Sequence, residues 1–228
     1  MSNQRFTVTL EKKKSLTHNV LELHFSKPEG FDYTAGQFVQ FFVPDGEKEL
    51  SRSYSLCTTP ADEHIGFCIK LLEDGKASKF FEAMRVGDSA EIEGPKGRFC
   101  NEHPTPLFFV ATGAGIAPIM GILKDELINK KNTAEMRLLF GVRNEKDLFW
   151  IDKFSALAAA HPQFTYTTVL SQPEKHWPGL RGRVTAHITA HSAKHRFFLC
   201  GSGDMVKDVR KLLLDQGVDA KQIHFEIF

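Results

Sequence analysis

The sequence predicts two domains of different fold class: a six-stranded antiparallel β-barrel, followed by an α/β domain with a five-stranded parallel sheet. In the first half, short runs rich in β-branched and aromatic residues follow one another between turn signals. In the second half, apolar strands alternate with helical segments, which implies right-handed crossovers and a sheet covered on both faces. The pattern changes near the two prolines Pro104 and Pro106, so we expect domains at residues 1–103 and 104–228.

In the first domain the strands are expected at 6–10, 20–25, 38–43, 52–56, 66–71 and 89–93. Segments rich in Pro, Gly and Asp separate many of them, at 28–30, 44–46, 59–60 and 86–88. Six short strands at this density favour a closed barrel, because closure removes exposed sheet edges. A single helix is expected to interrupt them at 78–84.

In the second domain the strands are expected at 107–111, 137–142, 164–170, 196–200 and 223–227. The helices between them are expected at 118–129, 152–160, 184–192 and 204–216. Open sheets of this kind bind ligands at the carboxyl ends of their strands. Residues that follow the strands are therefore the first candidates for a site.

The composition excludes several classes of protein. The 228 residues carry a formal net charge of +1, which argues against a general nucleic-acid binder. No apolar run approaches the roughly 18 residues that span a bilayer, and the first residues lack the apolar core of a secretion signal, so we expect a cytoplasmic protein. Cys57, Cys68, Cys100 and Cys200 form no Cys-x-x-Cys pair, which argues against a Cys-rich metal or iron–sulfur site.

The segment Arg52-Ser53-Tyr54-Ser55 combines a fixed charge, an aromatic ring and hydroxyl groups on one predicted strand. Because side chains alternate along a strand, Arg52 and Tyr54 point to one face, and Ser53 and Ser55 to the other. A charge and a flat ring on one face suit a planar ligand with a charged tail. A structural arginine on a half-buried strand is the alternative.

Two glycine-containing turns open predicted helices. Gly113 and Gly115 lie between a strand and a helix that starts near Pro118, where close backbone approach and the positive helix end suit a pyrophosphate. Pro118 replaces the third glycine of the dinucleotide fingerprint, and a plain tight turn is the alternative. Gly75-Lys76-Ala77-Ser78 is a second candidate phosphate cradle, with ordinary helix capping by Ser78 as its alternative.

Six motifs follow one another along the chain: Arg52-Ser53-Tyr54-Ser55, Lys70, Gly75-x-x-Ser78, Thr112-Gly113-x-Gly115-x-x-Pro118, Gly141-x-Arg143 and Cys200-Gly201. In this order they resemble the ferredoxin–NADP⁺ reductase superfamily, and the resemblance covers almost the whole chain. The resemblance implies that FAD binds the barrel and a nicotinamide nucleotide binds the second domain. It implies hydride transfer to flavin N5, followed by single-electron transfer. Because no iron–sulfur domain is supplied, the acceptor would be a separate small redox protein: a ferredoxin, a flavodoxin or an oxygenase component.

The resemblance also implies roles for individual residues. Ser55, Cys200 and Glu226 are the expected catalytic residues, with Ser55 near flavin N5 and Cys200 beside the nicotinamide. The expected cofactor-binding residues are Arg52, Ser53, Tyr54, Ser55, Cys68, Ile69, Lys70, Gly75, Lys76, Ala77, Ser78, Thr112, Gly113, Gly115, Pro118, Arg143, Ser171, Cys200, Gly201, Met205 and Phe228. No metal site is expected.

Several alternatives stay open. A flavin reductase that releases reduced flavin, and a non-catalytic redox sensor, are the competing functions, and Tyr54 with the Gly75–Ser78 cradle argues against the first. Gln172 and Pro173 stand where NADPH-selective relatives tend to place an arginine, which favours NADH, although Arg181 or Arg183 could reach a 2′-phosphate. We expect a monomer or weak dimer. His187, His191 and His195 would share one face of a long helix, where an exposed polar face explains them as well as a metal does.

Overall fold

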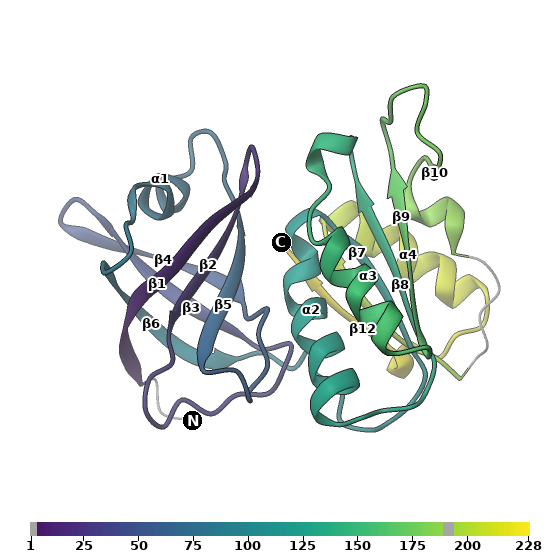
Figure 1. Cartoon of the computed structure of the whole chain (residues 1–228), viewed down its shortest axis with the longest axis horizontal. Coiled ribbons are helices and arrows are strands. Elements are labelled where there is room, and N and C mark those ends of the chain that lie inside the picture. The colour runs from purple at the N-terminus through teal and green to yellow at the C-terminus, as the bar shows by residue number, and fades with distance from the viewer. Residues whose placement is uncertain (1–3, 189–193) are drawn as a thin grey trace.

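A computed structural model describes residues 4–188 and 194–228, and Figure 1 shows two domains side by side. The barrel domain has the strand order β4-β3-β6-β1-β2-β5, and its paired strands are antiparallel. Its elements are β1 (Arg5–Thr17), β2 (Val20–Ser26), β3 (Phe38–Asp45), β4 (Lys48–Ser55), β5 (His64–Lys70), α1 (Lys76–Ala83) and β6 (Ser89–Lys96). The six predicted strands and the helix are confirmed.

Phenylalanine side chains fill the barrel. The Phe41 ring packs edge-on against Phe67 and Phe81, with centroids 5.0 and 5.1 Å away, and Tyr54 packs edge-on against Phe81 at 5.1 Å. Edge-to-face pairs of this kind fix ring orientation as well as burying area. The core therefore fixes the position of Tyr54 on β4.

Strand β1 runs further than the sequence predicted and includes Lys12, Lys13 and Lys14. The Lys13 ammonium donates hydrogen bonds to the carbonyl oxygens of Phe81, Glu82 and Met84, at 3.1, 2.6 and 2.8 Å. These carbonyls lie at the carboxyl end of α1, where a cation is favoured. Lys13 thus ties β1 to α1.

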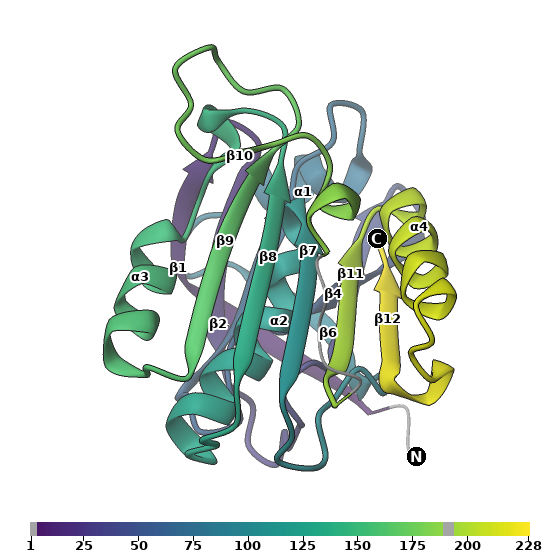
Figure 2. The ribbon, with the colours of Figure 1, turned by 90° about the vertical axis from the view of Figure 1, so that its right-hand side faces the viewer.

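The second domain has one parallel sheet of order β10-β9-β8-β7-β11-β12 within the described residues (Figure 2). Its strands are β7 (Leu107–Thr112), β8 (Met136–Val142), β9 (Phe164–Leu170), β10 (Leu180–Arg181), β11 (Arg196–Gly201) and β12 (Ile223–Ile227). Its α-helices are α2 (Ile116–Lys124), α3 (Ile151–Ala160) and α4 (Gly203–Asp215). The five predicted strands are confirmed, and the two-residue β10 extends the sheet to six.

Short 3₁₀ and π turns also occur in this domain, and one of them replaces a predicted helix. 3₁₀ turns span Gly113–Gly115, Glu145–Asp147, Val184–His187 and Ala220–Gln222, and a π-turn at Asp125–Asn129 continues α2. The helix predicted at 184–192 is wrong in its described part, because Val184–His187 is a 3₁₀ turn and Ile188 leaves helical geometry at φ −79°, ψ 83°. The β-branched Val184, Thr185 and Ile188 disfavour a longer helix.

The three histidines therefore do not share a helix face in the described chain. His187 Nε2 lies 2.8 Å from the carbonyl oxygen of Arg181, and the buried His195 lies 3.3 Å from Glu135. His191 falls outside the described residues. Within residues 4–188 and 194–228, no group of three or more His, Cys, Asp or Glu side chains is arranged to hold a metal ion.

Helix α2 lies between the sheet and the barrel (Figure 1). The hydrophobic core that includes α2 also contains barrel-side residues such as Val20, Cys57 and Cys68. A Cβ on Gly121 would lie 3.0 Å from the carbonyl oxygen of Thr58 and 3.1 Å from that of Leu56, so the barrel backbone rests on the helix at this point. The two domains are therefore packed through a shared core. None of the described helices is both long and apolar enough to cross a bilayer.

Candidate functional site between the domains

A cavity of about 1500 Å³ lies between the barrel and the carboxyl edge of the parallel sheet. It exceeds the roughly 300–1,000 Å³ of ordinary small-molecule pockets, so it has room for a long ligand or for two ligands. Most of the predicted site residues line it: Arg52, Tyr54, Ser55, Cys68, Lys70, Gly75, Lys76, Ala77, Ser78, Thr112, Gly113, Gly115, Arg143, Ser171, Gly201, Met205 and Phe228.

On the barrel side, the alternation of β4 brings Leu50, Arg52 and Tyr54 to the cavity. Ser53 is exposed and does not line it, as the alternation predicts. Ser55 lines it as well, at the end of the strand, although its position in the alternation predicted the opposite face. Burial raises the pKa of Tyr54, while the charge of Arg52 opposes this, so the phenol keeps its proton and can donate a hydrogen bond.

The loop before α1 forms a second part of the barrel wall. Ser78 Oγ accepts a hydrogen bond from the Leu72 backbone amide at 2.8 Å, so this hydroxyl closes the loop and does not cap α1, which was the alternative to a phosphate cradle. A Cβ on Gly75 would lie 2.6 Å from that oxygen, which explains the glycine. The first turn of α1 carries no side-chain cap, so its amides are available to a phosphate.

Opposite the barrel, two strand–helix turns touch through glycines. A Cβ on Gly115 would lie 2.3 Å from the carbonyl oxygen of Cys200, and one on Gly201 would lie 2.1 Å from Thr112 Oγ1. Gly201 also has φ +150°, a conformation that other residues rarely adopt. The Ser202 amide donates to Thr112 Oγ1 at 3.3 Å. These contacts bring the amino ends of α2 and α4 to one edge.

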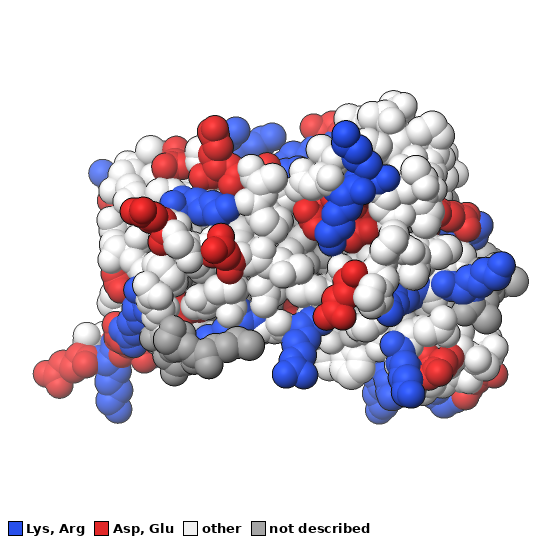
Figure 3. Space-filling model, turned by 90° about the horizontal axis from the view of Figure 1, so that it is seen from below, with Lys and Arg blue, Asp and Glu red and all other residues white. Residues whose placement is uncertain are grey.

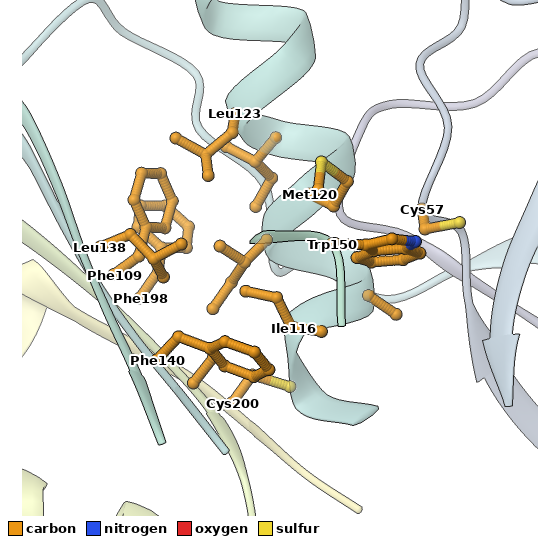
Figure 4. Packing of buried hydrophobic residues seen from close by; sticks show 14 of the residues in the cluster. Cys57, Phe109, Ile116, Met120, Leu123, Leu138, Phe140, Trp150, Phe198 and Cys200 are labelled. Carbon is orange, nitrogen blue, oxygen red and sulfur yellow. The ribbon is translucent and has the colours of Figure 1, made fainter. Parts of the chain in front are cut away.

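Some of the predicted residues lie behind the cavity surface. Ile69 and Pro118 are buried, and Figure 4 shows the Cys200 side chain in the core beside Phe140 and Ile116. Burial raises the pKa of the Cys200 thiol, with the charge of Glu226 adding to the effect, so the thiol is protonated. Cys200 therefore packs in the core and does not line the cavity, whereas the next residue, Gly201, does.

Glu226 joins the two domains at the end of the chain. Ser55 Oγ donates a hydrogen bond to Glu226 Oε2 at 3.5 Å, which connects β4 to β12. Burial raises the pKa of Glu226 to about 7, and the hydrogen bond from Ser55 opposes that shift. Glu226 does not itself line the cavity, whereas Ser55 and Phe228 do. The Phe228 amide donates to the Gly201 carbonyl at 3.1 Å.

The far end of the cavity is lined by Arg143, Ser171, Gln172 and Arg183. Arg181, which the sequence offered as an alternative cation, donates instead to the carbonyl oxygens of Glu174, Lys175 and Trp177 at 2.8–3.0 Å, so it holds a surface turn together. Of the two arginines, Arg183 lines the cavity and Arg181 does not, so Arg183 is the better placed to reach a bound nucleotide.

Sequence reasoning missed cavity residues on two turns. His18 and Asn19 come from the β1–β2 turn, and Asp147 comes from the turn after β8. His18 Nδ1 lies 3.8 Å from Asp147 Oδ1, across the domain boundary. No local motif marks these residues, because only the packing of one domain on the other brings them together.

Comparison with known proteins identifies the family. Residues 7–100 match the oxidoreductase FAD-binding domain, and residues 109–211 match the oxidoreductase NAD-binding domain. Ferredoxin–NADP reductase B of Sorangium cellulosum is 31% identical over 97% of this chain and 96% of its own length. The chain belongs to the ferredoxin–NADP⁺ reductase superfamily. It is a flavoenzyme of the oxidoreductase class, with FAD and a nicotinamide nucleotide as its cofactors.

Some members of the superfamily are longer, and others are of similar length. The toluate 1,2-dioxygenase electron transfer component of Pseudomonas putida is 30% identical over 86% of this chain, which spans only 59% of that protein. Among solved structures, the Amycolatopsis cytochrome P450 reductase GcoB has a TM-score of 0.90 and 25% identity, over 99% of this chain and 70% of that one. A ferredoxin NADP⁺ reductase from Neisseria gonorrhoeae, with bound FAD and NADP, shares the fold at a TM-score of 0.86 and 24% identity, over 100% and 99% of the two chains.

The residues of the cavity fit an FAD molecule. Arg52, Tyr54 and the uncapped start of α1 offer a cation, an aromatic ring and amides to a ligand with a flat ring and a pyrophosphate. The cavity then continues to the Thr112 and Gly201 edge, which leaves room for a second nucleotide.

Proposed function

We propose that this enzyme oxidises a reduced nicotinamide nucleotide and delivers electrons, one at a time, to a separate small redox protein. A ferredoxin, a flavodoxin or an oxygenase component would be the acceptor. The observation that carries the proposal is the continuous cavity from Tyr54 on the barrel to Gly201 on the sheet edge. Two flat rings bound at these walls can be held at about 3–3.5 Å, the separation that hydride transfer needs.

The proposed division of labour follows the cavity walls. Bound FAD supplies a ring that accepts a hydride and releases single electrons. Arg52 would neutralise a phosphate, Tyr54 would pack against the ring, and the segment 75–78 would hold the pyrophosphate. Thr112, Gly113 and Gly201 would receive the nicotinamide nucleotide. We also propose the domain limits 1–103 and 104–228, a cytoplasmic location, and a monomer or weak dimer.

Glu226 and Ser55 are proposed to handle protons at the ring. A carboxyl with a pKa of about 7 changes its protonation state near neutral pH. Ser55 lines the cavity and donates to that carboxyl at 3.5 Å, so its hydroxyl connects the buried acid to the ligand. This pair would then hold a proton beside the cavity, with Ser55 between the buried acid and the ligand.

The acceptor is inferred from relatives and not from a charged surface. On the face seen in Figure 3, Lys and Arg side chains mix with Asp and Glu, and no single charge dominates. The relatives include an electron transfer component of a dioxygenase and a reductase component of phenol 2-monooxygenase. These names support a protein acceptor over release of free reduced flavin.

We propose a preference for NADH over NADPH. Gln172 lines the cavity just after β9 and has no charge to pair with a 2′-phosphate. Arg143 and Arg183 line the same end and are the side chains that could oppose this preference. The ratio of kcat/KM for NADH and NADPH tests it, and a ratio in favour of NADPH would reassign the site to these arginines.

One purification and one rapid-mixing experiment test the main proposal. The protein should keep FAD through gel filtration, and anaerobic mixing with NADH should bleach its absorbance. Reoxidation is then followed with a ferredoxin, a flavodoxin and free FMN as acceptors. Faster reoxidation by a protein acceptor than by free FMN supports the proposal. Release of flavin during turnover favours a flavin reductase. If neither NADH nor NADPH bleaches the flavin, a non-catalytic redox sensor is favoured instead.

A further inference from the structure

A buried carboxylate on the barrel faces the second domain. Glu22 on β2 is 6% exposed. Its Oε1 accepts a hydrogen bond from Lys153 Nζ at 2.7 Å and its Oε2 accepts one from Trp150 Nε1 at 3.1 Å; both donors belong to the other domain. His24 Nε2 lies 3.1 Å from Oε1. Glu22 is the buried member of this pair, since the Lys153 side chain is 41% exposed, so removal of a donor leaves a buried carboxylate without compensation.

Glu22 stays charged across the ordinary pH range. Burial alone would raise its pKa, but the hydrogen bonds from His24, Lys153 and Trp150 lower it to about 2. The carboxylate therefore attracts Lys153 under all conditions in which the enzyme would work. The contact is a permanent link between the domains and not a pH switch.

Trp150 carries an unusual backbone conformation at this link. Its φ of +59° lies in the left-handed region, at the residue that precedes α3. Such a conformation persists in a large residue only where the surroundings hold it. Figure 4 shows the indole near Cys57 and Met120, and Trp150 belongs to the core that both domains share. The buried indole and its bond to Glu22 thus hold the chain where it enters α3.

The chain just before Trp150 forms a wall of the cavity. Arg143, Asn144, Asp147 and Phe149 all line it. The Asn144 backbone amide donates a hydrogen bond to Asp147 Oδ2 at 3.1 Å. The Asn144 side chain accepts one in return from the Asp147 backbone amide, and this reciprocal capping box makes the turn rigid. A rigid turn that is anchored at its end moves as one piece with that anchor.

The barrel end of the link also lies at the cavity. Glu22 is paired across the sheet with Cys68, which lines the cavity. A short path therefore runs from one wall, through Glu22 and Trp150, to the other wall.

We propose that Glu22 is a positioning residue, which holds the 143–149 segment at a fixed distance from the barrel and so sets the affinity for the nicotinamide nucleotide. Glu22 does not line the cavity, so it would act through the 143–149 segment and not by contact with the ligand. The inference rests on the proposed function, because it takes the nucleotide to bind at the sheet edge.

Calorimetric titration of the FAD-loaded protein with ADP-ribose tests the proposal without turnover. Glu22→Gln and Lys153→Met should each weaken ADP-ribose binding about fivefold or more, in the usual range of coupling between sites. Lys153→Arg keeps the cation and should restore binding. The FAD content per chain should be the same in all variants. If Glu22→Gln fails to fold, Trp150→Phe, which loses one donor, takes its place.

Asp62→Asn is the matched control. Asp62 pairs with Lys124 on α2 at 3.0 Å, another link between the domains, but neither residue lines the cavity. This variant should lose thermal stability and keep its affinity for ADP-ribose. Wild-type affinity in Glu22→Gln or its substitute would overturn the positioning role while leaving the proposed function intact. No binding by the wild-type protein would overturn both.

Discussion

The contact between the two glycine turns gives a quantitative prediction for Gly115→Ala. The new Cβ would lie 2.3 Å from the Cys200 carbonyl oxygen and 2.6 Å from the Gly201 amide nitrogen, whereas ordinary contact begins at 3.4 Å. Both neighbours are backbone atoms, so a side-chain rotation cannot relieve the overlap. The turns must therefore separate by about 1 Å, and overpacking of this kind costs about 1–3 kcal/mol.

Two measurements follow from this separation. For a chain of this size, about 2 kcal/mol lowers the thermal midpoint by about 4–8 °C, which differential scanning calorimetry resolves. Because the same turns form the sheet edge of the cavity, the affinity for ADP-ribose should fall as well, while FAD retention should stay unchanged.

Gly203→Ala is the control for Gly115→Ala. Gly203 lies in the first turn of α4, and its added Cβ would meet nothing closer than Ile227 Cγ2 at 3.5 Å. Alanine favours helix over glycine by up to about 1 kcal/mol, so this variant should be neutral or more stable. If Gly115→Ala and Gly203→Ala had the same thermal midpoint and the same affinity for ADP-ribose, the close approach of the two turns would not require glycine at position 115.

Three further predictions concern the cavity walls. Tyr54→Ala should lose more FAD during gel filtration than Tyr54→Phe, because phenylalanine keeps the ring; equal losses would contradict the packing role. Arg52→Ala should weaken FAD retention, and raising the salt concentration should weaken it further because salt screens the remaining charges. A loss that is independent of salt would contradict a phosphate contact. Glu226 has a pKa of about 7 in the folded protein and about 4.5 in the unfolded chain, so the folded protein binds this proton more tightly than the unfolded chain does. The free energy of unfolding should therefore fall as pH rises from about 4.5 to about 7. Glu226→Gln should flatten this part of a plot of thermal midpoint against pH.

The fold was predictable because its signals are local. Turn residues and the change from strand runs to alternating elements were enough for both sheets, including β12 at the chain end but not the two-residue β10. The failure at 184–192 has a local cause too, since the branched side chains of Val184 and Ile188 favour a short turn that helical periodicity does not reveal. The role of Lys13 was not predictable, because its three carbonyl partners lie about seventy positions away in the chain.

The site was predictable where one motif supplies several of its residues. Arg52 and Tyr54 lie two positions apart on a strand, so alternation alone places them together. Cys200 shows the limit of such reasoning, because its position at a strand end does not reveal that the side chain packs against Phe140. Glu22 and His18 gave no signal, since their partners come from the other domain.

Gly121 has a consequence for the engineering and evolution of this enzyme. A side chain at this helix position would place its Cβ 3.0 and 3.1 Å from the Thr58 and Leu56 carbonyl oxygens, so the barrel loop would have to move by a few tenths of an ångström to admit it. A barrel taken from another reductase would dock on α2 only if its loop and the helix kept the same backbone spacing. Chimeras that exchange whole domains should therefore be more stable where this helix position is glycine than where it carries a side chain.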